Sequence, residues 1–155
     1  MPVAEFFQLH RKQNIVAIGG YCLMPNHFHL LIHEIVDGGI TSFMRKLGTG
    51  YAMYFNLKNA RIGNLFVKPF RSKHVEDDRY LRHVAQYIHL NAAALFEPGM
   101  QRGQIKDFYK LEREMKIHLY SSFIDYSQKE KRLERQILNE EDADLIGSDL
   151  PSMVD

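Results

Sequence analysis

The stretch that decides the fold of this chain is YCLMPNHFHLLIHE, residues 21–34. From Asn26 onward, three histidines fall on one parity and three apolar residues fall on the other. The histidines are His27, His29 and His33, and the apolar residues are Phe28, Leu30 and Ile32. This period of two predicts a β-strand whose apolar face lies in the core and whose histidine face is open.

His27 and His29 are the first candidate metal ligands, because residues two apart in a strand stand side by side on one face. Two neutral ring nitrogens at one point suit a divalent metal ion. His33 shares the face but lies about 13 Å from His29 along a strand, too far to join the same ion. A histidine pair on a wet strand face is also common as plain polar surface, so the metal hypothesis needs a third ligand elsewhere.

Composition indicates a single soluble domain: the chain has 155 residues, of which 45% are hydrophobic. No apolar run approaches the roughly 20 residues needed to cross a bilayer, and the N-terminus has no signal-peptide pattern. Cys22 is the only cysteine, which excludes an internal disulfide and a cysteine-rich zinc site. We interpret Cys22 as a small core residue and expect a cytoplasmic protein without a membrane partner.

The net charge of +1 conceals an uneven distribution of charge. No Lys or Arg follows Arg135, whereas six acidic residues do, so the rest of the chain holds all 20 basic residues and 13 of the 19 acidic ones. No acidic residue occurs between Gly38 and Val75, where seven basic residues lie: Arg45, Lys46, Lys58, Arg61, Lys68, Arg71 and Lys73. Such one-sided charge favours binding to a phosphate backbone, and the alternative is a solvated basic face.

Pattern and turn signals predict the remaining elements. Gly19 and Gly20 indicate a bulge or bend before the histidine strand. A helix is predicted after a cap at Thr41 or Ser42, and another strand over residues 65–75 in spite of Pro69. The helix that starts at that cap is predicted to end at Lys58. Three further helices are predicted, over residues 79–90, 104–120 and 129–138.

Tyr87 and Asn91 lie four residues apart at the end of the predicted helix 79–90, and so on one face of it. Taken alone, Tyr87 would be a packed helix tyrosine and Asn91 a local cap.

Four motifs, in order, resemble those of the single-tyrosine transposases with the HUH signature, which is histidine, a bulky hydrophobe and histidine. Residues 21–32 resemble the HUH strand, and residues 87–91, YIHLN, resemble the helix with the nucleophilic tyrosine. Residues 65–72 and 120–126 resemble an intervening and a C-terminal block of the REP-associated branch. The sequence departs from the family pattern in two ways. Ala92 stands where the branch commonly has proline. Family members also usually have another β-strand before the region that begins here at Met1, so we expect an N-terminally truncated reading frame.

The resemblance implies an α+β fold with a central antiparallel sheet in the ferredoxin-like layout of HUH nucleases and helices mainly on one face. This transposase-like domain would span residues 1–126, followed by a C-terminal helix and an acidic tail over residues 127–155. The resemblance also implies that Tyr87 is the nucleophile and that a divalent ion, Mg²⁺ or Mn²⁺, is held by three residues: His27, His29 and Asn91.

The implied reaction is attack by the Tyr87 hydroxyl on a phosphodiester of single-stranded or hairpin-forming DNA, with a 5′-phosphotyrosine as the intermediate. The ion would polarise the phosphate, and the seven basic residues would contact DNA. The enzyme would be a monomer or a homodimer. Two alternatives stay open: a domesticated or decayed protein that binds hairpin DNA without cutting it, and a metal hydrolase acting on a small substrate, which the basic stretch disfavours.

Overall fold

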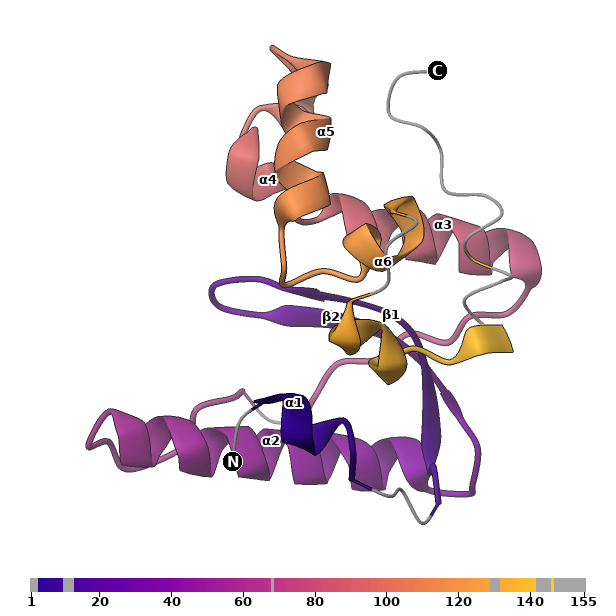
Figure 1. The fold of residues 1–155 in the computed structure, drawn as a ribbon. Coiled ribbons are helices and arrows are strands. Elements are labelled where there is room, and N and C mark those ends of the chain that lie inside the picture. The colour runs from indigo at the N-terminus through magenta and orange to yellow at the C-terminus, as the bar shows by residue number, and fades with distance from the viewer. Residues whose placement is uncertain (1–2, 10–12, 68, 129–131, 142–145, 147–155) are drawn as a thin grey trace.

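A β-hairpin that contains the histidine motif forms the centre of the structure (Figure 1). The computed structural model describes residues 3–9, 13–67, 69–128, 132–141 and 146. Strands β1, Val16–Leu23, and β2, Phe28–Glu34, pair antiparallel, with Cys22 opposite His29. Within the described ranges these two strands make up the sheet, and helices pack around it. The predicted α+β class with an antiparallel sheet is therefore confirmed.

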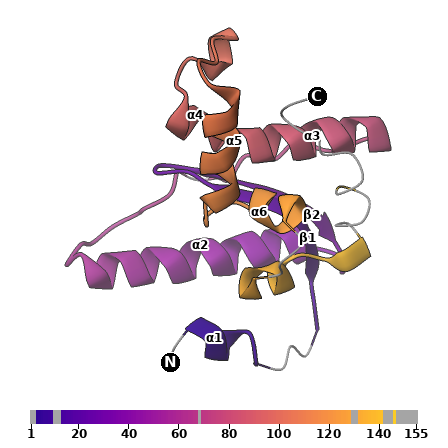
Figure 2. The same cartoon turned by 45° about the horizontal axis from the view of Figure 1, so that its top comes forward.

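The two longest helices lie on opposite sides of the hairpin, in both views of the fold (Figures 1 and 2). They are α2, Gly39–Lys58, and α3, Asp78–Leu90, and α3 makes the more extensive contact with the strands. The shorter helices are α1 Val3–Phe6, α4 Ala93–Phe96, α5 Phe108–Ile117 and α6 Phe123–Ser127, with the 3₁₀ helices η1 Met100–Arg102 and η2 Leu133–Ile137. None of the described helices combines the length and apolar character that crossing a bilayer requires.

The expected irregularity at the two glycines is confirmed, because the strand register shifts between Ile18 and Gly20. A Cβ atom at Gly20 would lie 3.5 Å from both the Nε2 atom of His89 and the Oγ atom of Ser122. A methyl group at this position would therefore be in ordinary van der Waals contact with α3 and with the C-terminal block. The carbonyl of Gly19 accepts a hydrogen bond from the hydroxyl of Tyr126.

The predicted open histidine face of β2 is confirmed in part: His27 and His33 are exposed, whereas His29 is half-buried. Leu31 has the same parity as His29, and it lies buried in a core cluster with Ala85 and Ile88 of α3. Cys22 is fully buried in the same cluster, as its interpretation as a core residue predicted. The opposite face is covered too, since the ring of Phe28 contacts that of Phe66 at 5.8 Å between centroids. Polar parity alone did not reveal that a distant helix covers part of the histidine side.

The stretch 65–75 is not a strand in its described residues, which corrects another prediction. Pro69 has no N–H group for a ladder, and the neighbouring side chains contact helices instead. Phe66 lies beside Tyr51 of α2, and Lys73 lies over Tyr80 of α3.

Three helix boundaries also differ from the predictions. Helix α2 begins at Gly39 because Gly38 turns the chain at φ 71° and a carboxylate oxygen of Glu34 accepts the N–H of Ile40 at 3.0 Å. Helix α5 is shorter than residues 104–120, since the Asp107 carboxylate caps its start. The described part of the predicted helix 129–138 forms η2, and residues 129–131 lie outside the described ranges.

Arg132 attaches the C-terminal segment to β1. Its guanidinium donates to both carboxylate oxygens of Asp125, at 2.8 and 2.7 Å, and to the hydroxyl of Tyr21 at 2.8 Å. It also donates to the carbonyls of Leu119 and Ser121, at 2.6 and 2.8 Å. The side chain of Asp125 is 0% exposed, so this ion pair is buried on the carboxylate side.

Arg132→Met should lower the free energy of unfolding by about 3–5 kcal/mol, because it leaves the buried Asp125 carboxylate without a countercharge. Urea unfolding followed by circular dichroism measures this change. The double variant Arg132→Met, Asp125→Leu removes the unpaired charge and should recover part of the lost stability. A double variant no more stable than the single one would contradict the importance of the buried charge.

His89 should make the fold sensitive to acid. Its burial lowers its pKa to about 4, whereas an unfolded histidine titrates at about 6.5. As the pH falls, the unfolded chain therefore binds the proton first. The free energy of unfolding should decrease between about pH 6.5 and about pH 4, by about 3 kcal/mol in total. His89→Asn should flatten the pH dependence of unfolding over this range. His83→Asn, at an exposed position of the same helix, is the control and should retain the wild-type slope.

Candidate active site

The rings of His27 and His29 lie next to each other at the end of the hairpin. Their centroids are 5.0 Å apart and their planes are perpendicular. Two imidazoles bound to one ion at metal–nitrogen distances of about 2 Å have centroids roughly 5 Å apart. The separation of the pair therefore fits a shared ion.

Each of the two imidazoles has a nitrogen available for an ion. The Nδ1 atom of His27 lies 2.7 Å from the Oδ1 atom of Asn26. An amide oxygen only accepts, so Nδ1 holds the proton in this pairing and Nε2 has the free lone pair. The Nε2 atom of His29 is buried and has no hydrogen-bond partner among the described residues. A cation would satisfy this buried nitrogen, which is costly to leave unpaired.

The electrostatic surroundings keep His29 neutral. Burial, and then the proximity of His27, lower the pKa of His29 below its ordinary value. A neutral imidazole is the form that binds a metal ion. The protonation state, the free nitrogen and the ring separation therefore all suit a divalent ion.

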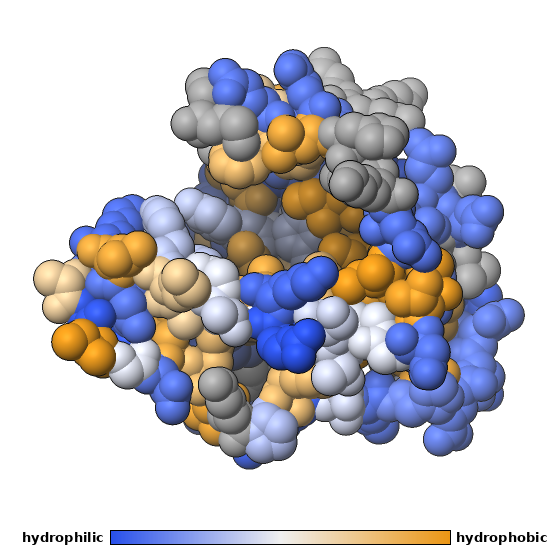
Figure 3. Space-filling model, turned by 90° about the horizontal axis from the view of Figure 1, so that it is seen from below, coloured by the Kyte–Doolittle hydropathy of each residue, from blue (hydrophilic) through white to orange (hydrophobic). Residues whose placement is uncertain are grey.

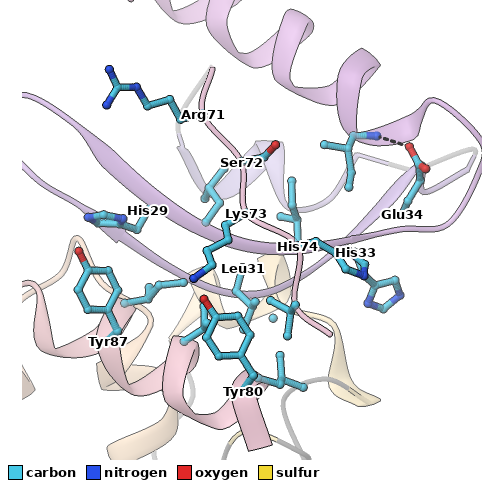
Figure 4. Close-up of a pocket in the computed structure, with 18 of the residues that line it drawn as sticks. His29, Leu31, His33, Glu34, Arg71, Ser72, Lys73, His74, Tyr80 and Tyr87 are labelled. Atoms are coloured by element: carbon cyan, nitrogen blue, oxygen red, sulfur yellow. Dashed lines mark hydrogen bonds between the residues drawn. The ribbon is translucent and has the colours of Figure 1, made fainter. Parts of the chain in front are cut away.

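Helix α3 places Tyr87 against this pair. The carboxylate of Asp77 caps the start of the helix by accepting the N–H of Tyr80 at 2.7 Å. Ala85 and Ile88 face the hairpin core, and the ring of Tyr87 lies 5.6 Å from that of His29 between centroids. Figure 4 shows the two rings side by side, one from the strand and one from the helix. Tyr87 is 60% exposed, so its hydroxyl is accessible to a large substrate.

Asn91 lies one turn beyond Tyr87, at the C-cap of α3. Its amide nitrogen donates to the carbonyl of Tyr87 at 2.6 Å, which is the local cap that the sequence allowed as an alternative. The amide oxygen is the atom that this arrangement leaves for an ion. Among the described residues, no group of three or more His, Cys, Asp or Glu side chains is placed to hold a metal. The role of Asn91 as a third metal ligand therefore stays a prediction from the sequence.

A pocket of about 1010 Å³ opens beside the His29–Tyr87 contact, between β2, residues 70–78 and α3 (Figure 4). Two of the predicted DNA-binding residues, Arg71 and Lys73, line it. The amine of Lys73 lies 4.8 Å from the ring centroid of Tyr80, and hydrogen bonding to the Tyr80 hydroxyl raises the pKa of Lys73. The pocket thus combines the candidate nucleophile with fixed positive charge.

Four of the other predicted basic residues lie along α2 and just after it, outside the lining of this pocket. Arg45 and Lys46 are exposed on the helix. Near its C-terminal end, the Lys58 amine lies 3.2 Å from the Tyr54 hydroxyl, and the Arg61 guanidinium donates to the Asn56 side chain at 3.2 Å. Lys68 lies outside the described residues. The basic stretch is therefore divided between the pocket and α2.

Two residues of the site were missed by the sequence reasoning. Asn26 orients His27, and its position directly before the histidine pair was the available signal. Tyr80 holds Lys73, and its spacing of seven residues from Tyr87 places both tyrosines on one face of α3.

A family model described as "Transposase IS200 like" matches residues 2–91. The match covers more than half of the 155 residues and includes the histidine pair, the pocket-lining segment 70–78, Tyr87 and Asn91. Comparison with curated proteins and with solved structures gave no match.

Calorimetric titration of the metal-free protein with Mn²⁺ tests the proposed ligands. His27→Ala and His29→Ala should each weaken binding at least about tenfold, because each removes one nitrogen ligand. Asn91→Ala should also weaken it. His33→Ala, on the same strand, should bind as the wild type does, and unchanged Mn²⁺ affinity in His29→Ala would contradict the metal site.

Proposed function

We propose that this chain, which belongs to the IS200-like transposase family, cuts and rejoins single-stranded DNA at hairpin-forming ends, with Tyr87 as the nucleophile. Family membership supports a transposase-like function in which DNA is the partner. The observation that most supports the finer proposal is the contact between the rings of Tyr87 and His29, 5.6 Å apart. It brings the candidate nucleophile to a candidate metal ligand from another part of the chain.

In the proposed reaction, the hydroxyl oxygen of Tyr87 forms a bond to phosphorus and the bond from phosphorus to the 3′ oxygen breaks. The phenol proton is released, and the 3′ oxygen leaves as a hydroxyl. The fragment whose 5′ end lies at the break stays on Tyr87 through its phosphate, as a 5′-phosphotyrosine, so its later transfer to another 3′-hydroxyl needs no nucleotide cofactor. The exposure of Tyr87 suits an extended strand that approaches from solvent.

The charged side chains of the pocket would hold the strand. Arg71 and Lys73 line the pocket that contains His29 and Tyr87, and Tyr80 limits the movement of the Lys73 amine. Positive charge at these positions binds phosphate and orients the backbone for attack. A divalent ion, Mg²⁺ or Mn²⁺, held by His27, His29 and Asn91, would supply further positive charge to the scissile phosphate.

The contact between the histidine pair and Tyr87 supports a site within one chain. His29 and Tyr87 are in contact within the same chain, which favours a site completed by a single protein molecule. A shared site would instead need the tyrosine helix of one molecule to reach the histidine pair of another.

Covalent capture tests the role of Tyr87. Incubation with Mn²⁺ and a 3′-labelled single strand that contains a cleavable site should leave the fragment whose 5′ end lies at the break attached to the protein after denaturation. Tyr87→Phe keeps the ring but removes the oxygen, so the adduct should disappear while DNA binding persists. Tyr109→Phe, an exposed tyrosine of α5, should retain the adduct. An adduct that mass spectrometry maps to any tyrosine other than Tyr87 would overturn the assignment.

The same assay separates the alternatives. A protein that binds hairpin DNA but never forms the adduct in Mg²⁺ or Mn²⁺ would be a non-cutting binder. Mixing His27→Ala with Tyr87→Phe protein should give no cleavage if each site lies within one chain. Recovered cleavage in the mixture would mean that two molecules share the site.

A further inference from the structure

The C-terminal half of α2 displays the rings of Tyr51 and Tyr54, and the ring of Phe66, from the segment that follows the helix, lies beside them. We name these three rings the aromatic stripe. Tyr51 and Tyr54 are 49% and 54% exposed. The ring of Tyr51 lies 6.2 Å from that of Tyr54 and 5.9 Å from that of Phe66, between centroids. The rings are tilted at 43° and 41°, so none of them stacks flat on the next. Their partly exposed surfaces are therefore left for another flat group.

The aromatic stripe begins at the rim of the candidate active site. Phe66 contacts Phe28 at 5.8 Å between ring centroids, and Phe28, although on the other face of β2 from His29, lines the same pocket as His29 and Tyr87. From there the rings continue along α2 to Tyr54. A strand of DNA bound along the stripe would thus lead to the hairpin end that holds the histidine pair.

Basic side chains accompany the rings. The Lys58 amine lies 5.6 Å from the ring centroid of Tyr54, and Arg61 follows directly after the helix. The sequence contains no acidic residue from Gly38 to Val75. Seen from below, the end of α2 that projects to the left shows hydrophobic and hydrophilic residues side by side (Figure 3). Flat rings next to fixed cations are the combination that binds single-stranded nucleic acid.

A second copy of the chain is a less suitable occupant of this surface. In a symmetric dimer the same patch faces itself, so the basic residues of the two copies would be brought together. Like charges in such an interface repel, whereas a phosphate backbone is attracted to the same residues. Charge complementarity therefore favours a nucleic acid strand.

We propose that the aromatic stripe binds unpaired bases of the DNA strand next to the site of cleavage, while Lys58 and Arg61 contact its phosphates. The position relative to cleavage rests on the proposed function of Tyr87. The binding itself does not, because bases stack on the rings whether or not the strand is cut.

Fluorescence anisotropy with a labelled oligothymidylate of about 12 nucleotides tests the proposal. The titration is done in EDTA, so that metal-dependent cleavage does not contribute. Tyr51→Ala and Tyr54→Ala should each weaken binding at least about fivefold, and Tyr54→Phe should bind as the wild type does. Tyr109→Ala, an exposed tyrosine on α5, is the matched control and should leave the affinity unchanged.

Two further comparisons separate bases from phosphates. An abasic strand of the same length should bind the tyrosine variants and the wild type equally well. The double variant Lys58→Ala, Arg61→Ala should reduce the slope of log affinity against log salt by about 2, whereas Tyr54→Ala should leave that slope unchanged. Loss of binding to the abasic strand in Tyr54→Ala would overturn stacking as the reason.

The remaining outcomes also decide the matter. Unchanged oligothymidylate affinity in both alanine variants would overturn the proposal. A wild-type dimer in sedimentation that Tyr51→Ala dissociates, with DNA affinity unchanged, would assign the surface to a second copy instead. Absence of a Tyr87 adduct together with tyrosine-dependent binding would refute the proposed cleavage and leave the aromatic stripe as a DNA-binding surface.

Discussion

The close packing of α3 against one face of the hairpin is the contact on which the rest of the structure depends. Small residues make it possible: Cys22 and Ala92 are fully buried, and Gly20 lies directly beside the ring of His89. This packing holds Tyr87 of the helix against His29 of the strand. Dense interiors tolerate added volume poorly, so a larger side chain at these positions would move the helix and separate the two groups.

Residues beyond the family match support that packing from the other edge of the hairpin. The carbonyl of Tyr120 accepts the N–H of Leu23 at 2.8 Å, and the N–H of Ser122 donates to the carbonyl of Tyr21 at 2.9 Å. These bonds pair backbone groups that an edge strand would otherwise leave open. Arg132 then secures the same block through Asp125. The part of the chain that matches the family model thus contains the candidate site. The part after it pairs with β1, the strand next to the histidine strand β2.

Much of the candidate site could be predicted from sequence because its signals are local. Residues two apart in a strand, or four apart in a helix, lie on the same face. This rule placed His27 beside His29 and Tyr87 beside Asn91. The sequence did not decide what the Asn91 amide contacts, because a helix cap and a metal ligand both require this residue at this position. The structure shows the cap. The contact between Lys73 and Tyr80 joins a loop to a helix, and no local period describes such a pair.

The sequence by itself determined the strand period of the histidine motif, the irregularity at Gly19 and Gly20, the helix after Asp77 and the one-sided charge. Each is a property of neighbouring residues and of their allowed backbone conformations. Only the tertiary structure decided that the histidine face is covered in part, at His29 and Leu31, that residues 65–75 form no strand in their described part, and that His29 meets Tyr87. Burial of a face and pairing of an edge depend on which distant element packs there, and that depends on the shapes and volumes of all the elements together.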